Sequence, residues 1–459
     1  MSWRTVKLGE LVENFSVRAK DVGGAEGLDF YGVSNEYGII KTKYAAEDKA
    51  EDYKIIEKGC FAYNPYRVNV GSIGLVSDDT RGLISPAYVI FKPKPKSIIP
   101  ELLFKFLKSA EGLRQIIFYA RGTVRQALRF EDLCNIEISI PDYSEQQDLY
   151  NKLINSQKSS NILDAELKNQ LELLKKLRKQ LLQDAVQGKL VEQNKMDEPA
   201  SELLNKIKAE KEQLIAENLP ASKAGKLKKE KELSPIKREE IPFEIPENWV
   251  WCRLGDLCIE ILGGYAFDST RYSKMETQNQ VIRLGNVKPN QLVLETTPVF
   301  IDDDYAKEAL RASLIEGDIL ITMTGTRAKK DYLFTLCLTK SDLQTKNLFL
   351  NQRVGCFRFG LFMVNSYINI ALKDVRLLNA VFESSTGAAN QANIGIAALK
   401  DILIPLPPLA EQNRIVQKID ELVQYCNELE ASIKQSELQN EKLLQQVLRE
   451  VLRKEPIGV

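Results

Sequence analysis

Two polar clusters, each with a counterpart later in the chain, carry side chains suited to contacting nucleic-acid bases. Residues 61–74 place Tyr, Asn, Arg and Ser among turn residues, and residues 321–330 are their counterpart. Residues 121–126 match residues 385–391 in the same way. Arginine can donate two hydrogen bonds to guanine, asparagine and glutamine can bind adenine, and serine, threonine and lysine can contact phosphates. Each cluster alone is more simply interpreted as a polar surface loop. Because the clusters recur at matching places in the chain, nucleic-acid binding is nearly as good an interpretation.

The composition excludes most catalytic chemistry. The 459-residue chain contains no histidine, which rules out Ser-His-Asp triads, Cys-His dyads and histidine-based metal sites. It has no GxxxxGK[ST] loop for nucleotide phosphates and no GxGxxG motif after a strand. The segment Asn64-Pro65-Tyr66 is similar to the base-holding motif of amino-methyltransferases but lacks its second proline, and we interpret it as a turn between strands. We therefore expect no catalytic residue and no metal site.

The overall composition is typical of a globular cytoplasmic protein. The 63 basic and 63 acidic residues cancel, which excludes a dominant polycationic tail but leaves room for a local basic groove. The seven cysteines include no CxxC pair, which indicates reduced thiols. The sequence does not start with a secretory leader and has no run of ~18 apolar residues, so we expect a soluble cytoplasmic protein without membrane contact.

Four ordered anchors indicate that the chain is a tandem duplication. The motif Trp-x4-Leu-Gly-Glu/Asp-Leu begins at Trp3 and again at Trp249, at an offset of 246 residues. The offset grows to 258 and then to 266, as expected when loops lengthen between fixed elements. Chance similarity is the alternative explanation. The three further anchors pair residues 58–61 with 316–319, 133–141 with 399–407, and 144–146 with 410–412.

Each copy combines a globular part with a long helix. Short β-rich runs such as 87–91 and 318–322 alternate with turns, and residues 100–118 are expected to be helical, which predicts an α+β unit. Apolar residues at alternating spacings of four and three then predict a coiled-coil seam in each helix, with antiparallel pairing as the simplest geometry and an ordinary helical bundle as the alternative. The expected seams are Leu149, Leu153, Ser156, Ser160, Leu163, Leu167, Gln170, Leu174, Leu177 and Leu181, and Ile415, Ile419, Leu422, Cys426, Leu429, Ile433, Ser436, Asn440, Leu443 and Val447.

A highly charged segment, residues 192–245, joins the two copies. Its lysine-rich stretch, residues 223–231, could contact nucleic acid, but a solvated linker is the simpler interpretation. The first helix ends in a Gly-Lys-Leu sequence at 188–190 that the second helix lacks. We therefore expect the ends of the two helices to differ.

In combination, these motifs resemble those of the specificity subunits of type I restriction–modification systems. Besides the two Trp motifs, the resemblance rests on residues 138–146 and 404–412, which lead into the two helices, and on residues 241–249, typical of the second domain's start. Asn-Gln-Arg at 351–353 and Asn-Gln-x-Asn at 390–393 resemble positions in the recognition domains of this family. The resemblance covers essentially the whole chain.

The resemblance implies a DNA-reading subunit that is not itself an enzyme. Two target-recognition domains bind the halves of a bipartite, asymmetric site in double-stranded DNA, and the paired helices separate them. Two methylation subunits dock on this framework and methylate adenine at N6 with S-adenosylmethionine. Restriction subunits, with ATP and Mg, are a further expected partner. No cofactor is expected on this chain.

These inferences give the predicted domains and site. We expect an α+β fold with target-recognition domain 1 at 1–143, a spacer helix at 144–191, the charged linker at 192–245, target-recognition domain 2 at 246–408 and a spacer helix at 409–455. Because the loops of the two domains differ widely, two different half-sites are expected. The predicted DNA-contacting residues are Tyr63, Asn64, Tyr66, Arg67, Asn69, Arg121, Arg125, Gln126, Asn286, Thr322, Thr324, Arg327, Asn351, Gln352, Arg353, Asn390 and Gln391.

Two other functions stay open at this point. The chain could be the recognition part of a single-chain methyltransferase or restriction enzyme, which needs a cofactor domain that this sequence lacks. It could also be a coiled-coil scaffold that binds only proteins. Sequence-dependent retention on duplex DNA separates the specificity subunit from the scaffold.

Overall fold

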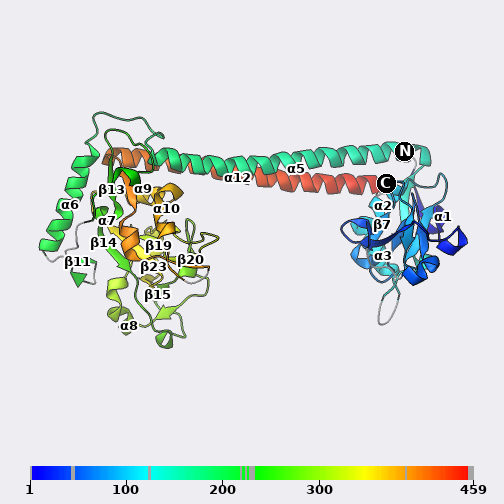
Figure 1. Ribbon diagram of the computed structural model, residues 1–459, viewed down its shortest axis with the longest axis horizontal. Coiled ribbons are helices and arrows are strands. Elements are labelled where there is room, and N and C mark those ends of the chain that lie inside the picture. Colours follow the sequence, from blue (N-terminus) through cyan, green and yellow to red (C-terminus); the bar gives the residue numbers. More distant parts are fainter. Residues whose placement is uncertain are drawn as a thin grey trace, which may run out of the picture. The chain divides into compact units, whose positions relative to one another are not determined.

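The computed structural model describes residues 3–42, 47–121, 126–217, 220–222, 225–226, 233–387 and 390–452. The chain forms two compact units: unit 1 comprises Met1–Asn169 with Ile433–Val459, and unit 2 comprises Gln170–Ser432. Two helices of 44 residues, α5 (Tyr143–Val186) and α12 (Leu409–Leu452), each contribute one part to unit 1 and the other part to unit 2. Figure 1 labels the elements of both units.

Unit 1 contains two four-stranded sheets and a two-stranded pair. In the first sheet every neighbouring pair is antiparallel, and its strand order is β2-β9-β6-β7. The strands of this sheet are β2 (Val12–Asn14), β9 (Val89–Pro93), β6 (Phe61–Tyr63) and β7 (Ile73–Leu75). The second sheet has the order β4 (Gly38–Lys41), β3 (Asp29–Ser34), β8 (Gly82–Ile84) and β5 (Lys54–Ile56), and the pair is β1 (Trp3–Lys7) with β10 (Glu137–Pro141).

Helices cover the first sheet of unit 1 and complete its core. Pro100 begins α2, where its fixed φ is compatible with a first helical position, and the Ser109 hydroxyl caps α3 by accepting from Gly112 N at 3.1 Å. Phe61 and Phe91 stack in the core, with ring centroids 4.8 Å apart. The helices are α1 (Leu8–Leu11), α2 (Pro100–Lys108), α3 (Ala110–Tyr119) and α4 (Phe130–Leu133).

Unit 2 repeats this plan with longer connections. Its antiparallel four-stranded sheet has the order β14 (Cys258–Gly263), β23 (Val354–Phe359), β19 (Ile319–Thr322) and β21 (Thr335–Cys337). A three-stranded sheet follows the order β18 (Phe300–Ile301), β15 (Asn279–Ile282) and β22 (Asn347–Leu350). The smaller pairs are β13 (Val250–Arg253) with β25 (Leu403–Leu406), β16 (Val287–Lys288) with β17 (Gln291–Leu292), β20 (Thr324–Thr326) with β24 (Gln391–Asn393), and β11 (Pro220–Ser222) with β12 (Gly225–Lys226).

One helix of unit 2 lies where the sequence analysis predicted a charged linker. The helices of this unit are α6 (Ala200–Ala216), α7 (Leu254–Leu257), α8 (Asp303–Glu308), α9 (Asn365–Ala371), α10 (Val375–Glu383) and α11 (Ile396–Lys400), besides the parts of α5 and α12. Helix α6 lies in the segment expected to be a charged linker. It buries Ala200, Leu203 and Ile207, spaced by three and four residues, in the core of unit 2. The lysine-rich stretch 223–231 falls largely outside the described residues.

A buried glutamine anchors the start of each long helix, and the two units use it identically. Gln146 donates from Nε2 to Pro141 O at 3.2 Å, and its Oε1 accepts from Ile99 N at 2.9 Å. Gln412 donates to Pro407 O at 3.0 Å and accepts from Val364 N at 3.2 Å. Both glutamines are fully buried. The Glu-Gln anchor seen in the sequence therefore joins each helix to its own globular part.

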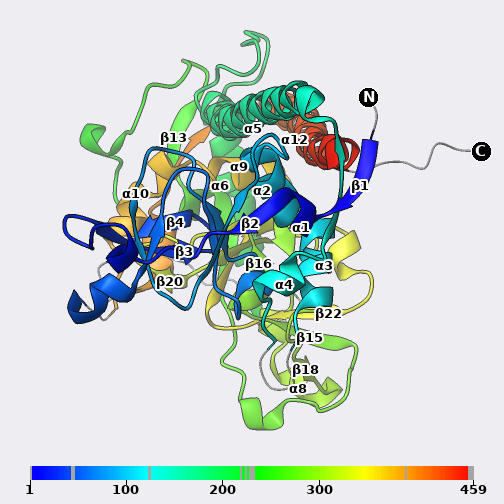
Figure 2. The ribbon, with the colours of Figure 1, turned by 90° about the vertical axis from the view of Figure 1, so that its right-hand side faces the viewer.

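Within each unit the parts of α5 and α12 contact one another and run in opposite directions. In unit 1, Asn440 Nδ2 donates to Ser160 O at 3.1 Å and to Asp164 Oδ1 at 2.7 Å. In unit 2, Arg178 Nη2 donates to Glu430 Oε2 at 2.9 Å. Figures 1 and 2 both show the two helices side by side.

The predicted seams are buried or half-buried at fifteen of their twenty positions and exposed at five. Leu167 and Leu174 are buried as expected, but the predicted seam residues Leu163, Leu177, Leu429 and Leu443 are 42%, 45%, 52% and 60% exposed. The adjacent residues Asp164, Arg178, Glu430 and Leu444 are half-buried in their place. The prediction was wrong at these four leucines. At three of them the neighbouring charged residue makes a polar contact at the helix interface, which an apolar pattern does not reveal, and beside Leu443 the neighbouring leucine lies there instead.

Helix α5 ends at Val186, before position 191, because a glycine lies two residues beyond its end. Gly188 has φ +69°, the left-handed conformation that commonly terminates helices, and Lys189 N donates to Asp184 O at 2.9 Å. A Cβ at Gly188 would lie 2.4 Å from Pro246 Cγ. Helix α12 extends to Leu452, and the rest of its predicted span lies outside the described residues.

All seven cysteines are free, as predicted. Cys252 and Cys356 are buried in unit 2, and burial raises the pKa of both thiols. Within the described residues no helix is both long enough and apolar enough to cross a membrane.

Candidate nucleic-acid interface

In unit 1 the two predicted polar clusters lie on adjoining loops. The first loop leaves β6, and Asn64 Oδ1 closes its turn by accepting from Tyr66 N at 3.0 Å. Arg121 and Ala127 exchange backbone hydrogen bonds of 3.0 and 2.8 Å at the second loop. Leu128 N donates to Pro65 O at 3.1 Å and thereby joins the two loops.

Several predicted side chains of unit 1 are accessible at these loops. Tyr66 is 58% exposed, and Arg67, Asn69 and Gln126 are also exposed. Arg121 Nε lies 3.1 Å from Asp132 Oδ1, although the arginine side chain is 76% exposed. The Asp132 side chain is only 11% exposed, so Arg121 covers a largely buried carboxylate while most of its own side chain faces solvent. Arg125 lies outside the described residues.

In unit 2 the corresponding clusters form a two-stranded sheet. Strand β20 pairs with β24, so that Thr326 lies opposite Gln391. Arg327 N donates to Asn390 O at 2.7 Å, and Ala328 N donates to Asn390 Oδ1 at 3.1 Å. Arg327 Nη2 also donates to Ser385 O at 3.1 Å. The structure therefore brings residues 324–328 together with Ser385, Asn390 and Gln391.

One backbone contact is common to the loop pairs of the two units. In unit 2, Ile394 N donates to Met323 O at 2.8 Å. This hydrogen bond corresponds to the one from Leu128 N to Pro65 O in unit 1. The donors differ by 266 positions and the acceptors by 258, the offsets of the sequence anchors nearest to them. The same local scaffold thus carries both pairs of polar clusters.

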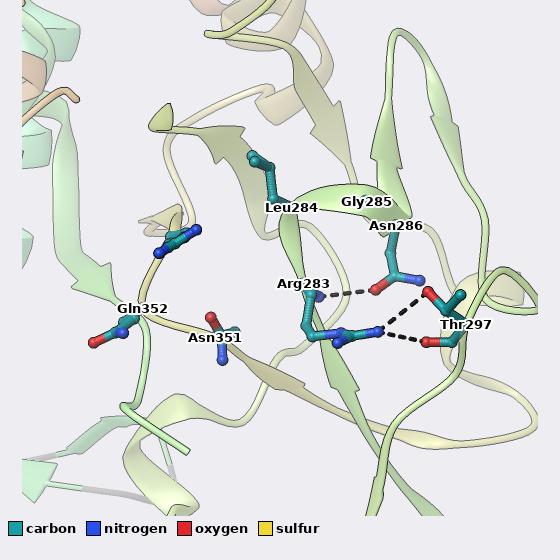
Figure 3. A pocket seen from close by; sticks show the side chains of 8 residues that line it. Arg283, Leu284, Gly285, Asn286, Thr297, Asn351 and Gln352 are labelled. Atoms are coloured by element: carbon teal, nitrogen blue, oxygen red, sulfur yellow. Dashed lines mark hydrogen bonds between the residues drawn. The ribbon is translucent and has the colours of Figure 1, made fainter. Parts of the chain in front are cut away.

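The third predicted cluster of unit 2, residues 351–353, lies beside the same loops. Arg353 O accepts from Met323 N at 3.2 Å. Residues 351–353 form one wall of an open pocket of about 420 Å³, and residues 283–286 with Thr297 form another (Figure 3). Asn351 is half-buried, whereas Gln352 and Arg353 are exposed. The pocket consequently combines two arginines with three amide side chains, of which that of Asn286 is buried.

Three predicted contact residues are structural instead. Tyr63 is 0% exposed and belongs to the core of unit 1. Thr322 is buried, and its Oγ1 accepts from Phe334 N at 2.9 Å. Asn286 is also buried and uses Oδ1 to accept from Arg283 N at 2.9 Å. The prediction of direct contact is wrong for all three because the fold encloses them. Thr322 and Asn286 use their polar groups within it, and the Tyr63 hydroxyl is buried with no hydrogen-bond partner among the described residues.

The remaining predicted residues of unit 2 stay accessible. Arg327, Asn390 and Gln391 are exposed, and Thr324 is half-buried. Asp331 supports this loop because its Oδ1 accepts from Thr326 N at 2.5 Å, and that hydrogen bond lowers the pKa of the Asp331 carboxyl. The negative charge therefore persists at neutral pH within a loop that presents Arg327.

A buried ionic cluster supports the sheet that carries these loops. Arg358 on β23 donates to both carboxylate oxygens of Asp318 at 2.8 and 2.7 Å and to Glu260 Oε2 at 3.1 Å. Arg358 and Asp318 are 3% and 1% exposed. Burial raises the pKa of the Glu260 carboxyl. The cluster connects β14 and β23 with the residue that precedes β19, at the other end of these strands from the loops.

Arg283 and Thr297 line the pocket but were missed by the sequence analysis. Arg283 follows the buried strand β15, which is the one sequence signal that could have identified it. Thr297 is remote in sequence and meets Arg283 only through the fold. In the part of the chain that the structure describes, no group of three or more Cys, Asp or Glu residues is arranged to hold a metal ion.

Comparison with known proteins adds three curated relatives from Escherichia coli. The type I restriction enzyme EcoAI specificity subunit is 37% identical over 260 residues, which cover 56% of this chain and 41% of that protein. The EcoEI specificity subunit is 29% identical over 57% of this chain and 42% of its own length. The EcoDI specificity subunit is 22% identical over 99% of this chain and 89% of its own length. The chain thus matches about two fifths of the length of the first two relatives.

Solved structures share the fold. The crystal structure of the HsdS subunit from Thermoanaerobacter tengcongensis aligns with a TM-score of 0.56 at 18% identity and covers 99% of this chain and 97% of that one. A chain from a study of complex assembly and conformational transition of the type I R-M system aligns with a TM-score of 0.55 at 18% identity, over 98% of this chain and 97% of the other.

The family comparison covers most of the sequence. The model of the type I restriction modification DNA specificity domain matches residues 2–173 and again residues 246–439. The two matched segments correspond to the two copies identified by the sequence anchors. This chain therefore belongs to the type I restriction modification DNA specificity domain family.

Proposed function

We propose that this chain is the DNA-sequence-specificity subunit of a type I restriction–modification complex. Each unit binds one half of a bipartite, asymmetric site in double-stranded DNA through its polar loops. The chain selects the sequence and leaves the chemistry to its partners. The names of the curated relatives, all specificity subunits of type I restriction enzymes, support this proposal.

The observation that carries the proposal is that both units have the same four-stranded sheet, with the same two loops joined in the same way. Leu128 and Pro65 in unit 1, and Ile394 and Met323 in unit 2, make the same backbone contact, whereas the side chains around them differ. A shared scaffold with divergent polar loops is the arrangement expected of two readers with two different half-sites.

The residues that we propose to contact DNA are the accessible members of the predicted set. Arginines and amides in this set can hydrogen-bond to base edges, and hydroxyl and arginine groups can also contact phosphates. They are Asn64, Tyr66, Arg67, Asn69, Arg121 and Gln126 in unit 1, and Thr324, Arg327, Asn351, Gln352, Arg353, Asn390 and Gln391 in unit 2; Arg125 is retained as a sequence-based candidate.

We further propose that α5 and α12 form an antiparallel coiled coil that sets the spacing of the half-sites. The contact of Asn440 with Ser160 in unit 1 and that of Arg178 with Glu430 in unit 2 support antiparallel pairing. A buried asparagine at a helix interface can specify register, which a spacer of fixed length requires.

Two methylation subunits are the proposed protein partners, with S-adenosylmethionine bound to them, and restriction subunits with ATP and Mg are a further partner. Each unit leaves a comparable apolar group on its helices, which supports two equivalent docking sites. In unit 1 the exposed residues are Ile162, Leu163, Leu438 and Leu443, and in unit 2 they are Leu173, Leu177, Tyr425 and Leu429.

Genome-wide mapping of N6-methyladenine tests this function. Cells that express the chain with its methylation subunits should carry a bipartite motif that disappears when the chain alone is deleted. The methylation subunits without this chain serve as the control. A methylation pattern that is indifferent to the chain would contradict the proposal and favour a scaffold that binds only proteins.

A further inference from the structure

The pocket in unit 2 between residues 283–286 and 351–353 contains an arginine that is held at one end and free at the other. Arg283 Nη2 donates to Thr297 O at 2.7 Å and to Thr297 Oγ1 at 3.2 Å. Its Nε and Nη1 make no hydrogen bond with any part of the chain that the structure describes. Figure 3 shows the side chain extended toward Thr297. The guanidinium is therefore oriented while donors remain for a ligand.

The threonine that holds Arg283 has an unfavourable backbone conformation. Thr297 has φ +47°, which a β-branched residue rarely adopts. Strain of this kind persists only where the surrounding structure imposes it, and it is frequent at binding sites. Here the strain places both acceptors of Thr297 against a single guanidinium nitrogen.

Asn286 imposes this geometry on the loop. Its Oδ1 accepts from Arg283 N at 2.9 Å, and its Nδ2 donates to Val293 O at 2.8 Å and to Thr296 O at 3.4 Å. The buried asparagine thus ties the residue that carries the guanidinium to the segment that receives it. Because Asn286 uses its own polar groups in this way, its contribution to binding is indirect.

The opposite wall offers further unpaired polar groups. The backbone of this wall is fixed, since Asn351 N donates to Ile282 O at 3.0 Å and Gln352 N donates to Tyr265 O at 3.1 Å. The side chains of Asn351, Gln352 and Arg353 make no hydrogen bond among the described residues. Among the residues that the structure describes, no carboxylate and no lysine lines the pocket.

These groups suit a base edge better than a phosphate. A phosphate presents only acceptors, whereas the amides of Asn351 and Gln352 offer donors and acceptors together. An arginine that is fixed in orientation matches the O6 and N7 acceptors of guanine. We propose that this pocket reads a guanine in the half-site bound by unit 2, with Arg283 as the contact residue and Thr297 as its positioning residue. This inference rests on the proposed function.

Variants of Arg283 test the inference in the full chain assembled with its methylation subunits. Arg283→Ala should lower discrimination at one guanine of one half-site by roughly 5- to 150-fold, the value of one base-specific pair. Arg283→Lys should not restore the discrimination, because an ammonium lacks the planar fork. Arg283→Gln retains a donor for Thr297 O and guards against collapse of the loop. Thermal unfolding of each variant checks its folding.

Thr297→Ala tests the positioning role through base discrimination at one motif position, which a purely structural residue would not change selectively. It removes Oγ1 and should relax the same guanine position by roughly 2- to 10-fold, with the other positions unchanged. Arg271→Ala is the matched control, because it also removes an arginine from unit 2, but one that pairs with Glu308 outside the pocket. This control should leave the methylated motif unaltered.

The outcomes separate the inference from the proposed function. Even weakening on all sequences after Arg283→Ala would place the guanidinium on a phosphate and overturn the base-reading role. An unchanged motif and affinity in the Arg283 variants would remove the pocket from the DNA path, while the wild-type motif would still support the proposed function. If the wild-type complex methylated no specific motif at all, the proposed function itself would be overturned.

Discussion

At the strand position where unit 2 buries Arg358, unit 1 carries Lys92. The positions match by register, since Glu13 lies opposite Lys92 in β2–β9 and Glu260 lies opposite Arg358 in β14–β23. Arg358 is bound to Asp318 in the interior, whereas Lys92 contacts the half-exposed Glu57 and lies 4.0 Å from the centre of the Phe15 ring.

The residue that corresponds to Asp318 is also different in unit 1. It is Cys60, which is buried among apolar residues and has its thiol pKa raised to about 11 by burial. The sheet thus keeps its strand order with an ionic interior in one unit and an apolar interior in the other. Strand pairing and the alternation of buried residues, which both units share, determine this architecture, and the supporting contacts are free to diverge.

Exchange of the globular part of unit 1 is the most severe test of this comparison. Replacing residues 1–141 with the equivalent part of another family member should change one half of the methylated motif completely, because each sheet supports its own loops. The other half should stay as it is. Sequencing of N6-methyladenine in the chimera measures both halves, and a change in both would show that the units do not read independently.

The helix pair offers a second test, in which both units keep their loops. Inserting seven residues between Leu167 and Leu174, and seven between Glu430 and Glu437, preserves the spacing of buried positions in both helices. Seven residues add ~10 Å of helix. Because DNA advances 3.4 Å per base pair along a strand, the unread spacer should lengthen by about three base pairs. The matched control inserts the same residues in α5 alone and should reduce methylation without a new spacing.

Loss of the basic side chain at this strand position should destabilise the two units unequally. Arg358→Met leaves the buried Asp318 carboxylate unpaired and should destabilise unit 2 by about 3–5 kcal/mol. Lys92→Met removes a partly exposed pair and should change the free energy of unfolding of unit 1 by only about 0–1 kcal/mol. Urea unfolding of both variants measures the difference, and equal losses would contradict the contrast between the two interiors.

The sequence predicts the repeated parts of the fold better than it predicts the short helix between the two copies. The duplication and the paired polar clusters were predictable, because the anchors at Trp3 and Trp249 and at the buried glutamines keep their order. Helix α6 was missed because many charged residues surround its short apolar stripe of Ala200, Leu203 and Ile207.

The site was less predictable than the fold because residue type does not reveal burial. Tyr63 and Thr322 have suitable side chains but end buried strands. The Arg283 pocket depends on Thr297 and on residues 351–353, which are far apart in sequence and meet through the pairing of β15 with β22. A pattern within one cluster cannot report such a contact.

The smallest expected effect concerns a single seam position that was predicted to be buried and is exposed. In unit 1, Leu163 is 42% exposed and Leu167 is 5% exposed, although both belong to the predicted seam. Leu163→Gln should therefore change the free energy of unfolding by no more than about 0.5 kcal/mol. Leu167→Gln is the matched control and should cost several times more, about 2 kcal/mol or above, because it places an amide in an apolar contact. Urea unfolding compares the two. Leu163→Gln should hardly change stability. If it nevertheless weakens binding of the methylation subunits, Leu163 contributes to docking. Equal destabilisation by the two variants would instead show that Leu163 contributes to the helix interface.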